Sequence, residues 1–152
     1  MDYSRVVEKV REFNRFYMPT MKLLGNQYLG SEYSVTEARV FFEIHEREGC
    51  NAAHIAAVMN IDKSYLRKIL AGHEKAGYLR REPSARDRRS YDLYLTEKGK
   101  ARAEELIQKS NDEIKAILGY LSEGERLQLA QALDTIMAVL QKGEGRDENR
   151  SV

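Results

Sequence analysis

Residues 51–96 read NAAHIAAVMNIDKSYLRKILAGHEKAGYLRREPSARDRRSYDLYLT, and this stretch decides the fold that we predict. Apolar side chains recur three and four positions apart in two places, which predicts one helix over residues 52–59 and a second over residues 63–75. A short strand over residues 78–81 and an alternating strand over residues 91–95 follow. The stretch therefore predicts two short helices and a pair of strands.

The residues at the helix ends support these assignments. Asn51 and Asp62 stand at the two N-cap positions, where a side-chain oxygen accepts a backbone hydrogen bond. Asn60 lies in the turn between the helices and tolerates a positive φ better than most residues, and Gly77 is suited to end the second helix. Two helices joined by so short a turn are typical of a helix-turn-helix unit, whose second helix lies in the major groove of DNA.

Positive charge is concentrated in the second helix and the strands that follow it. From Asp62 to Arg89 there are nine Lys or Arg against four Asp or Glu, which gives +5, whereas the whole chain carries +1. The rest of the chain therefore sums to −4. This asymmetry favours double-stranded DNA as a partner of the central stretch.

We expect the outward side of the second helix to contact this DNA. Its polar and cationic residues there are Lys63, Ser64, Tyr65, Arg67 and Lys68. Arg67 and Lys68 are candidates for guanine or phosphate contacts, and the sequence leaves that choice open. Tyr65 offers a ring to a thymine methyl group and a hydroxyl to a phosphate, and its alternative role is packing within the helix pair.

The loop between the strands contains Asp87-Arg88-Arg89, and the second strand leads into Leu95-Thr96-Glu97-Lys98-Gly99. Over about residues 6–140, this order and spacing resembles the MarR family of winged-helix transcriptional regulators. The resemblance implies a wing in which Arg89 enters the minor groove, while Asp87 pairs with Arg89 and holds its guanidinium in position. It also implies that Arg86 and Arg88 neutralise phosphates; the alternative is an arginine-rich turn that is only solvated surface.

Further helices are predicted on both sides of this unit. One covers residues 3–29, with a kink or a break at Pro19. A capping box over residues 34–37 opens another that runs to about residue 47. Behind the wing, Thr96 caps a helix to about residue 121, and a second capping box over residues 122–125 opens a last helix, which Gly143 closes.

The predicted fold is mainly α (α+β), with a winged helix-turn-helix DNA-binding domain over residues 33–95. Residues 1–32 and 96–142 form a helical dimerisation region, and residues 143–152 a flexible tail. The terminal helices carry more apolar surface than so small a domain covers, so we expect a two-fold homodimer. Such a dimer would bind a pseudo-palindromic operator as a regulator, and we expect a repressor.

The resemblance also implies a small-molecule effector that shifts the dimer away from its DNA-binding geometry. Candidate contacts are Tyr17, Met21 and His45, although core packing or a subunit interface is the favoured explanation of the apolar side chains around Tyr17 and Met21. The first part of the chain, including residues 13–17 and 28–30, is also similar to the regulator portion of chains fused to an acetyltransferase. No segment of acetyltransferase length follows, so that activity is not expected.

No enzyme, metal or cofactor is expected. The three histidines and one cysteine are scattered over different helices, which does not predict a zinc site. His45 and His73 are each followed by a glutamate, but neither has the second histidine of a zinc-protease motif. No apolar run approaches the roughly 20 residues that span a bilayer, and no signal peptide is recognisable, so we expect a cytoplasmic protein.

Two alternatives to this function stay open. Cys50 precedes a helix N-terminus, a setting that can lower the pKa of a thiol, which would suit a redox-sensing regulator. A winged-helix module that binds proteins instead of DNA is the other, although the arginine-rich loop counts against it. His73 replaces an aliphatic residue common in the family, and we expect it to be buried and neutral, with a pH-sensing role as the alternative.

Overall fold

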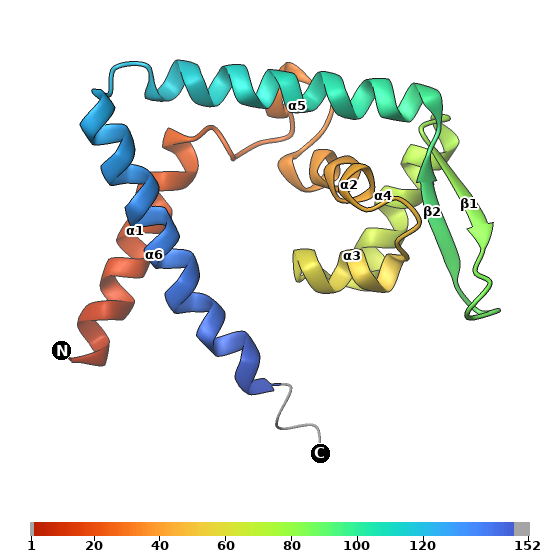
Figure 1. Cartoon of the computed structure of the whole chain (residues 1–152), viewed down its shortest axis with the longest axis horizontal. Coiled ribbons are helices and arrows are strands. Elements are labelled where there is room, and N and C mark those ends of the chain that lie inside the picture. The colour runs from red at the N-terminus through yellow and green to blue at the C-terminus, as the bar shows by residue number, and fades with distance from the viewer. Residues whose placement is uncertain (1, 148–152) are drawn as a thin grey trace. The chain divides into compact units, whose positions relative to one another are not determined.

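The computed structural model describes residues 2–147 and confirms a mainly helical fold with one small antiparallel sheet (Figure 1). Internal contacts divide the chain into two units, one up to Ile114 and one from Lys115 onward. The domain boundaries expected at residues 32 and 95 stay a prediction. Within the described residues, no helix has the length and apolar content that crossing a bilayer requires.

The first helix, α1 (Tyr3–Thr20), is shorter than the helix over residues 3–29 that the sequence predicted. Pro19 lies in its last turn and has no N–H to donate to the carbonyl four residues earlier. The chain then takes left-handed backbone at Lys22 (φ 55°) and Leu29 (φ 57°) and makes one 3-10 turn, η1 (Tyr28–Gly30). Of the two outcomes predicted at Pro19, the structure shows the break.

The next helix, α2 (Val35–Glu46), begins with the capping box that the sequence predicted. The backbone N–H of Glu37 donates to Ser34 Oγ over 3.2 Å, and the backbone N–H of Ser34 donates to Glu37 Oε1 over 3.1 Å. Two otherwise unpartnered N–H groups are thereby satisfied at the start of the helix.

The helix-turn-helix consists of α3 (Ala52–Met59) and α4 (Lys63–Lys75), with the predicted bounds. The Asn51 side chain caps α3 by accepting a 2.8 Å hydrogen bond from the backbone N–H of His54. Asn60 takes the left-handed conformation expected of it (φ 50°). Asp62 occupies the N-cap position of α4 but makes no side-chain cap bond.

The two strands are β1 (Leu79–Pro83) and β2 (Tyr91–Leu95); β1 starts one residue later and ends two residues later than predicted. They pair antiparallel, with Leu79 opposite Leu95. The backbone of Leu93 also exchanges hydrogen bonds with Gly49 and Cys50, each over 2.8 Å. The connection between α2 and α3 is therefore fastened along β2, which fixes the wing against the helix-turn-helix.

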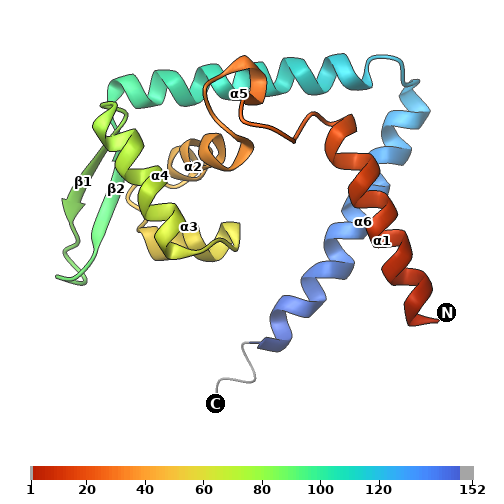
Figure 2. The ribbon, with the colours of Figure 1, turned by 180° about the vertical axis from the view of Figure 1, so that it is seen from behind.

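The core lies where these elements meet. Seen from behind, α2, α3 and α4 gather beside the two strands (Figure 2). Each element contributes side chains that are almost fully buried: Phe41, Ile44, Ile55, Leu66, Leu70, Leu79, Leu93 and, from α5, Leu106. Burial of this apolar surface is the main force that holds α4 and the wing in place.

The fifth helix, α5 (Glu97–Leu118), follows β2 and begins against the turn that ends α4. It ends three residues before the predicted residue 121. Thr96 Oγ1 accepts a 3.0 Å hydrogen bond from the backbone N–H of Gly99 and donates over 2.7 Å to the carbonyl of Gly77. A Cβ atom at Gly99 would lie 2.0 Å from the carbonyl oxygen of Tyr78. Only glycine allows this approach.

The last helix, α6 (Glu123–Asp147), opens with the predicted capping box between Ser122 and Glu125. It continues through Gly143, where the sequence predicted its end. A helix tolerates an interior glycine at a cost of about 1 kcal/mol, so Gly143 alone does not stop it. Residues 143–147 are thus helical where a flexible tail was predicted, and the rest of that tail, residues 148–152, lies outside the described residues.

Candidate nucleic-acid interface

The outward side of α4 carries the five residues that the sequence selected for DNA contact. All five are exposed: Lys63, Ser64, Tyr65, Arg67 and Lys68. The opposite side is buried through Leu66, Ile69, Leu70 and His73, as predicted. Tyr65 is 44% exposed, so packing within the helix pair, the alternative for this side chain, does not describe it.

His73 connects α4 to α2. It is buried, its Nε2 lies 3.0 Å from the carbonyl oxygen of Glu37, and its ring centroid lies 4.1 Å from that of Phe41. Because a carbonyl only accepts, Nε2 carries the proton and donates. Burial lowers the pKa of His73, which confirms the prediction of a buried neutral histidine.

The wing loop, residues 84–90, is ordered by its own side chains. Ser84 Oγ accepts from the backbone N–H of Arg86 over 3.2 Å, and Asp87 Oδ1 accepts from the backbone N–H of Arg89 over 2.9 Å. The expectation that Asp87 holds the Arg89 guanidinium was therefore wrong. The short Asp87 side chain reaches the backbone N–H two residues later more readily than it reaches the guanidinium at the end of the long Arg89 side chain. Asp87 therefore shapes the turn.

The arginines of the wing divide into two groups. On β1, Arg80 lies over the Tyr94 ring at 4.5 Å and pairs with Glu82, and Arg81 Nε pairs with Glu74 over 2.8 Å. The loop arginines predicted to meet DNA are exposed and, among the described residues, make no ion pair: Arg86, Arg88 and Arg89. The sequence could not distinguish these groups, because the Arg81 pair depends on how β1 packs beside α4 and the Arg80 ring contact on the pairing of the strands.

A hollow of about 860 Å³ lies between α4 and the wing, and we call it the wing groove. One wall is the α2–α3 connection with the first turn of α3, from Arg47 to His54. The opposite wall is the wing with Arg86 and Arg89, and α4 contributes Arg67. Positive side chains therefore face this space from several elements.

Cys50 does not have the environment that a reactive thiolate requires. Its side chain is 6% exposed, and burial raises the pKa of the thiol. The alternative of a pKa lowered by the nearby helix N-terminus is not found, because desolvation of the charged form outweighs that effect. The geometry gives the redox alternative no support.

The three effector candidates do not converge on one site. Tyr17 stacks on Phe13 with ring centroids 5.0 Å apart, and His45 Nε2 lies 3.9 Å from Glu104 Oε1. Met21 is half-buried near the end of α1. None of the three lines the hollow of about 610 Å³ that lies between the segment after α1 and α5, whose lining includes Lys22, Tyr28 and Lys109.

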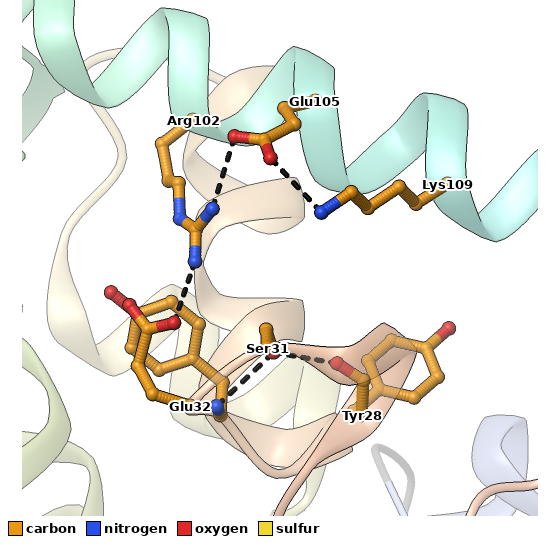
Figure 3. A network of polar contacts seen from close by, with 7 residues as sticks. Tyr28, Ser31, Glu32, Arg102, Glu105 and Lys109 are labelled. Atoms are coloured by element: carbon orange, nitrogen blue, oxygen red, sulfur yellow. Dashed lines mark hydrogen bonds and ion pairs between the residues drawn. The ribbon is translucent and has the colours of Figure 1, made fainter.

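A polar network ties that segment to α5, centred on Arg102 (Figure 3). The Arg102 guanidinium donates to Glu32 over 2.7 Å and to Glu105 over 3.0 Å, and lies over the Tyr33 ring at 5.5 Å. Burial, with Glu32 beside the hydroxyl, raises the pKa of Tyr33 to about 12. The Tyr33 ring meets His73 edge-on at 5.3 Å, so contacts run from α5 to α4.

Sequence reasoning missed Arg102 and Glu32. The two residues are 70 positions apart, and no local pattern marks such a pair. The signal available was an arginine one turn inside a predicted amphipathic helix, which is ordinarily a solvated residue.

Comparison with known proteins shows what this part of the chain is similar to. Residues 32–90 match the model of the MarR family. An uncharacterised HTH-type transcriptional regulator of Bacillus subtilis, YfiV, is 25% identical over 138 residues, which cover 88% of this chain and 86% of the relative.

Solved structures share the fold. A mutant MarR from E. coli in complex with operator DNA has a TM-score of 0.71 at 21% identity, over 90% of this chain and 99% of that one. Streptococcus pneumoniae FabT in complex with DNA has a TM-score of 0.67 at 21% identity, over 93% and 99%. A MarR regulator from Methanosarcina mazei has a TM-score of 0.72 at 17% identity, over 91% and 98%.

The domain match, the curated relative and the fold all agree with the resemblance stated from the sequence. The expectation that the chain is not an enzyme is confirmed, because these proteins are regulators. The likeness to regulators fused to an acetyltransferase stays untested. Over residues 32–90 this chain matches the MarR family, and it shares the fold of solved MarR-family regulators.

Proposed function

We propose that this regulator binds double-stranded DNA through α4 and the wing loop. The observation that carries the proposal is the exposed polar and cationic side of α4, next to three loop arginines outside any ion pair of the described residues. The structural neighbours from E. coli and S. pneumoniae were solved with DNA, and they share the fold. A wing without this charge would have suited the protein-binding alternative.

A homodimer is part of the proposal. Within α1, Phe16 is 67% exposed, and Val6, Val10 and Phe13 are exposed beside it at helical spacing. Within α6, Leu140 is 69% exposed, with Leu127, Ile136 and Met137 also exposed. A second copy would cover these faces and present two recognition helices to half-sites about 10 base pairs apart. Light scattering tests this: a particle of one chain's mass at micromolar concentration would contradict it.

Ligand-responsive repression in the cytoplasm completes the proposal, and it rests on the family. The hollow lined by Lys22, Tyr28 and Lys109 is within the usual size range of small-molecule sites. One of its lining residues, Lys22, directly follows Met21 in the sequence. An effector there is expected to raise the melting temperature of the wild type but not of Tyr28→Ala, and to weaken DNA binding. Effectors that bind and leave DNA affinity unchanged would contradict it.

The test of DNA binding is a salt titration with duplex DNA from upstream of the gene, followed by fluorescence anisotropy. Arg89→Ala is compared with Arg39→Ala, which removes the same charge from an exposed side chain of α2. We expect saturable binding that prefers this duplex to a scrambled one, weakens steeply with salt and drops for Arg89→Ala alone. Equal binding to every duplex, with no effect of Arg89→Ala, would favour the protein-binding module.

A further inference from the structure

We infer that α4 divides two tasks between neighbouring residues: Lys68, with Ser64, faces the bases, whereas Arg67 holds a phosphate in the wing groove. This inference rests on the proposed DNA binding and resolves the choice between Arg67 and Lys68 that the sequence left open. Two independent observations carry it, the position of each residue around the helix and the lining of the wing groove.

Positions around α4 follow from 3.6 residues per turn, or about 100° per residue. The buried stripe is centred on Leu66 and Leu70, which are 1% exposed. Ser64 and Lys68 each lie two residues from Leu66, so both point about 160° away from it. They form the outermost ridge of the helix, which is the part that enters a groove most deeply.

Arg67 is on a flank of the helix instead. It directly follows Leu66, which turns it about 100° from the buried stripe, whereas Tyr65 lies about 100° to the other side. The wing groove identifies which flank faces the wing: its lining includes Arg67 and Leu70 of α4, but not Ser64, Tyr65 or Lys68. Arg67 therefore points along the gap between the helix and the wing.

The charges around the wing groove favour an anion. Five arginines line it against three acidic residues: Arg47, Arg67, Arg81, Arg86 and Arg89 against Glu48, Asp87 and Asp92. Three of the charged groups are already engaged: Arg81 pairs with Glu74, Glu48 pairs with Lys100 over 3.9 Å, and Asp87 accepts from a backbone N–H. Arg67 makes no ion pair with any described residue, so its guanidinium is available to a ligand.

The geometry of duplex DNA specifies the anion. A helix in the major groove and a wing in the adjacent minor groove have one sugar-phosphate backbone between them. The wing groove is the space this backbone would occupy, and phosphate is the charged group of DNA. A guanidinium binds phosphate oxygens bidentately. Such a contact positions the protein but does not read the base sequence.

The two roles predict different responses of a full-length variant. Affinities are measured for the duplex that the wild type prefers and for a panel with each base pair replaced in turn, at several salt concentrations. Arg67→Ala is expected to weaken every duplex by one common factor, and to reduce the slope of log K against log salt by about 2, one phosphate per subunit of the dimer. Arg67→Lys keeps a positive charge and should restore most of the slope.

Lys68→Ala is expected to act on selectivity. The preference for the best duplex over its variants should fall by about tenfold at one pair of symmetric positions and stay unchanged elsewhere. Arg39→Ala, the exposed control on α2, should change neither quantity.

Each outcome decides between the possibilities. A base-pair-specific effect of Arg67→Ala, or a uniform effect of Lys68→Ala, would overturn the division of tasks while leaving DNA binding intact. A wild type that prefers no duplex would refute the proposed function, and this inference with it. Melting temperatures near that of the wild type show that the variants fold, as is expected for exposed side chains.

Discussion

Gly99 is the position at which one methyl group should disturb the whole junction between α4, β1 and α5. A Cβ atom there would lie 2.0 Å from the Tyr78 carbonyl oxygen, whereas real Cβ contacts are essentially never under 3.0 Å. In Gly99→Ala the start of α5 must therefore move by about 1 Å. Such a shift disturbs the bonds by which Thr96 joins Tyr78, Gly77 and the first turn of the helix.

The magnitude follows from those contacts. Three hydrogen bonds hold the junction, at 3.0, 2.7 and 3.0 Å, and each contributes about 1 kcal/mol net. Alanine's higher helix propensity offsets about 1 kcal/mol of the loss. The free energy of unfolding should therefore fall by about 2 kcal/mol, which lowers the melting temperature by about 4–8 °C in a chain of this size.

Urea unfolding followed by far-UV circular dichroism measures this change. Gly72→Ala is the matched control, because no described residue lies within 4 Å of a Cβ at Gly72, in the last turn of α4. It should leave stability unchanged or raise it by up to about 1 kcal/mol. If Gly99→Ala were as stable as the wild type, the close approach at Tyr78 would not be the reason for glycine at this position.

Three other predictions concern a buried histidine, a buried cysteine and a half-buried arginine. Because the pKa of His73 is lowered, the unfolded chain binds a proton below about pH 6.5 that the folded chain does not, so the free energy of unfolding should fall with pH until the folded pKa is passed. His73→Leu should flatten this part of the plot of stability against pH. An unchanged plot would contradict the burial of a neutral histidine. Cys50, 6% exposed, should react with a thiol reagent far more slowly in native protein than in urea, and equally fast labelling in both would revive the redox alternative. Arg102→Ala should lower the free energy of unfolding, measured in urea, by about 2 kcal/mol, because the Arg102 side chain is only 16% exposed and ion-paired. Lys9→Ala removes an ion pair whose lysine is 67% exposed, so it should have little effect. Equal losses in the two variants would contradict this ranking.

Local signals in the sequence predicted the elements that local chemistry controls. The capping box at Ser34, the cap at Asn51 and the left-handed Asn60 each depend on residues within three positions, and each is found as predicted. The same reasoning was less reliable at element ends. Helix α1 ends one residue after Pro19, whereas α6 continues through Gly143. Proline removes a backbone hydrogen-bond donor, whereas glycine only increases the flexibility of the backbone, so proline disrupts a helix more strongly.

Long-range contacts explain what the sequence could not predict. Cys50 is buried because the α2–α3 connection pairs with Leu93 of the second strand, and this burial raises the pKa of a thiol whose pKa the local sequence left open. From the sequence, the arginines of the wing could not be told apart. In the structure Arg81 is neutralised by an ion pair with Glu74 of α4. The candidate DNA contacts on α4 were predictable because they are what remains outside a clear apolar stripe.

The most direct test of the central claim, that α4 and the wing form the DNA interface, is methylation footprinting on the preferred duplex. Dimethyl sulfate modifies guanine N7 in the major groove and adenine N3 in the minor groove, so one reagent reports on both. We predict that the wild type protects guanines in two segments about 10 base pairs apart and adenines in the flanking minor groove, and that Arg89→Ala loses the adenine protection alone. Binding without guanine protection, or adenine protection that survives Arg89→Ala, would contradict the account.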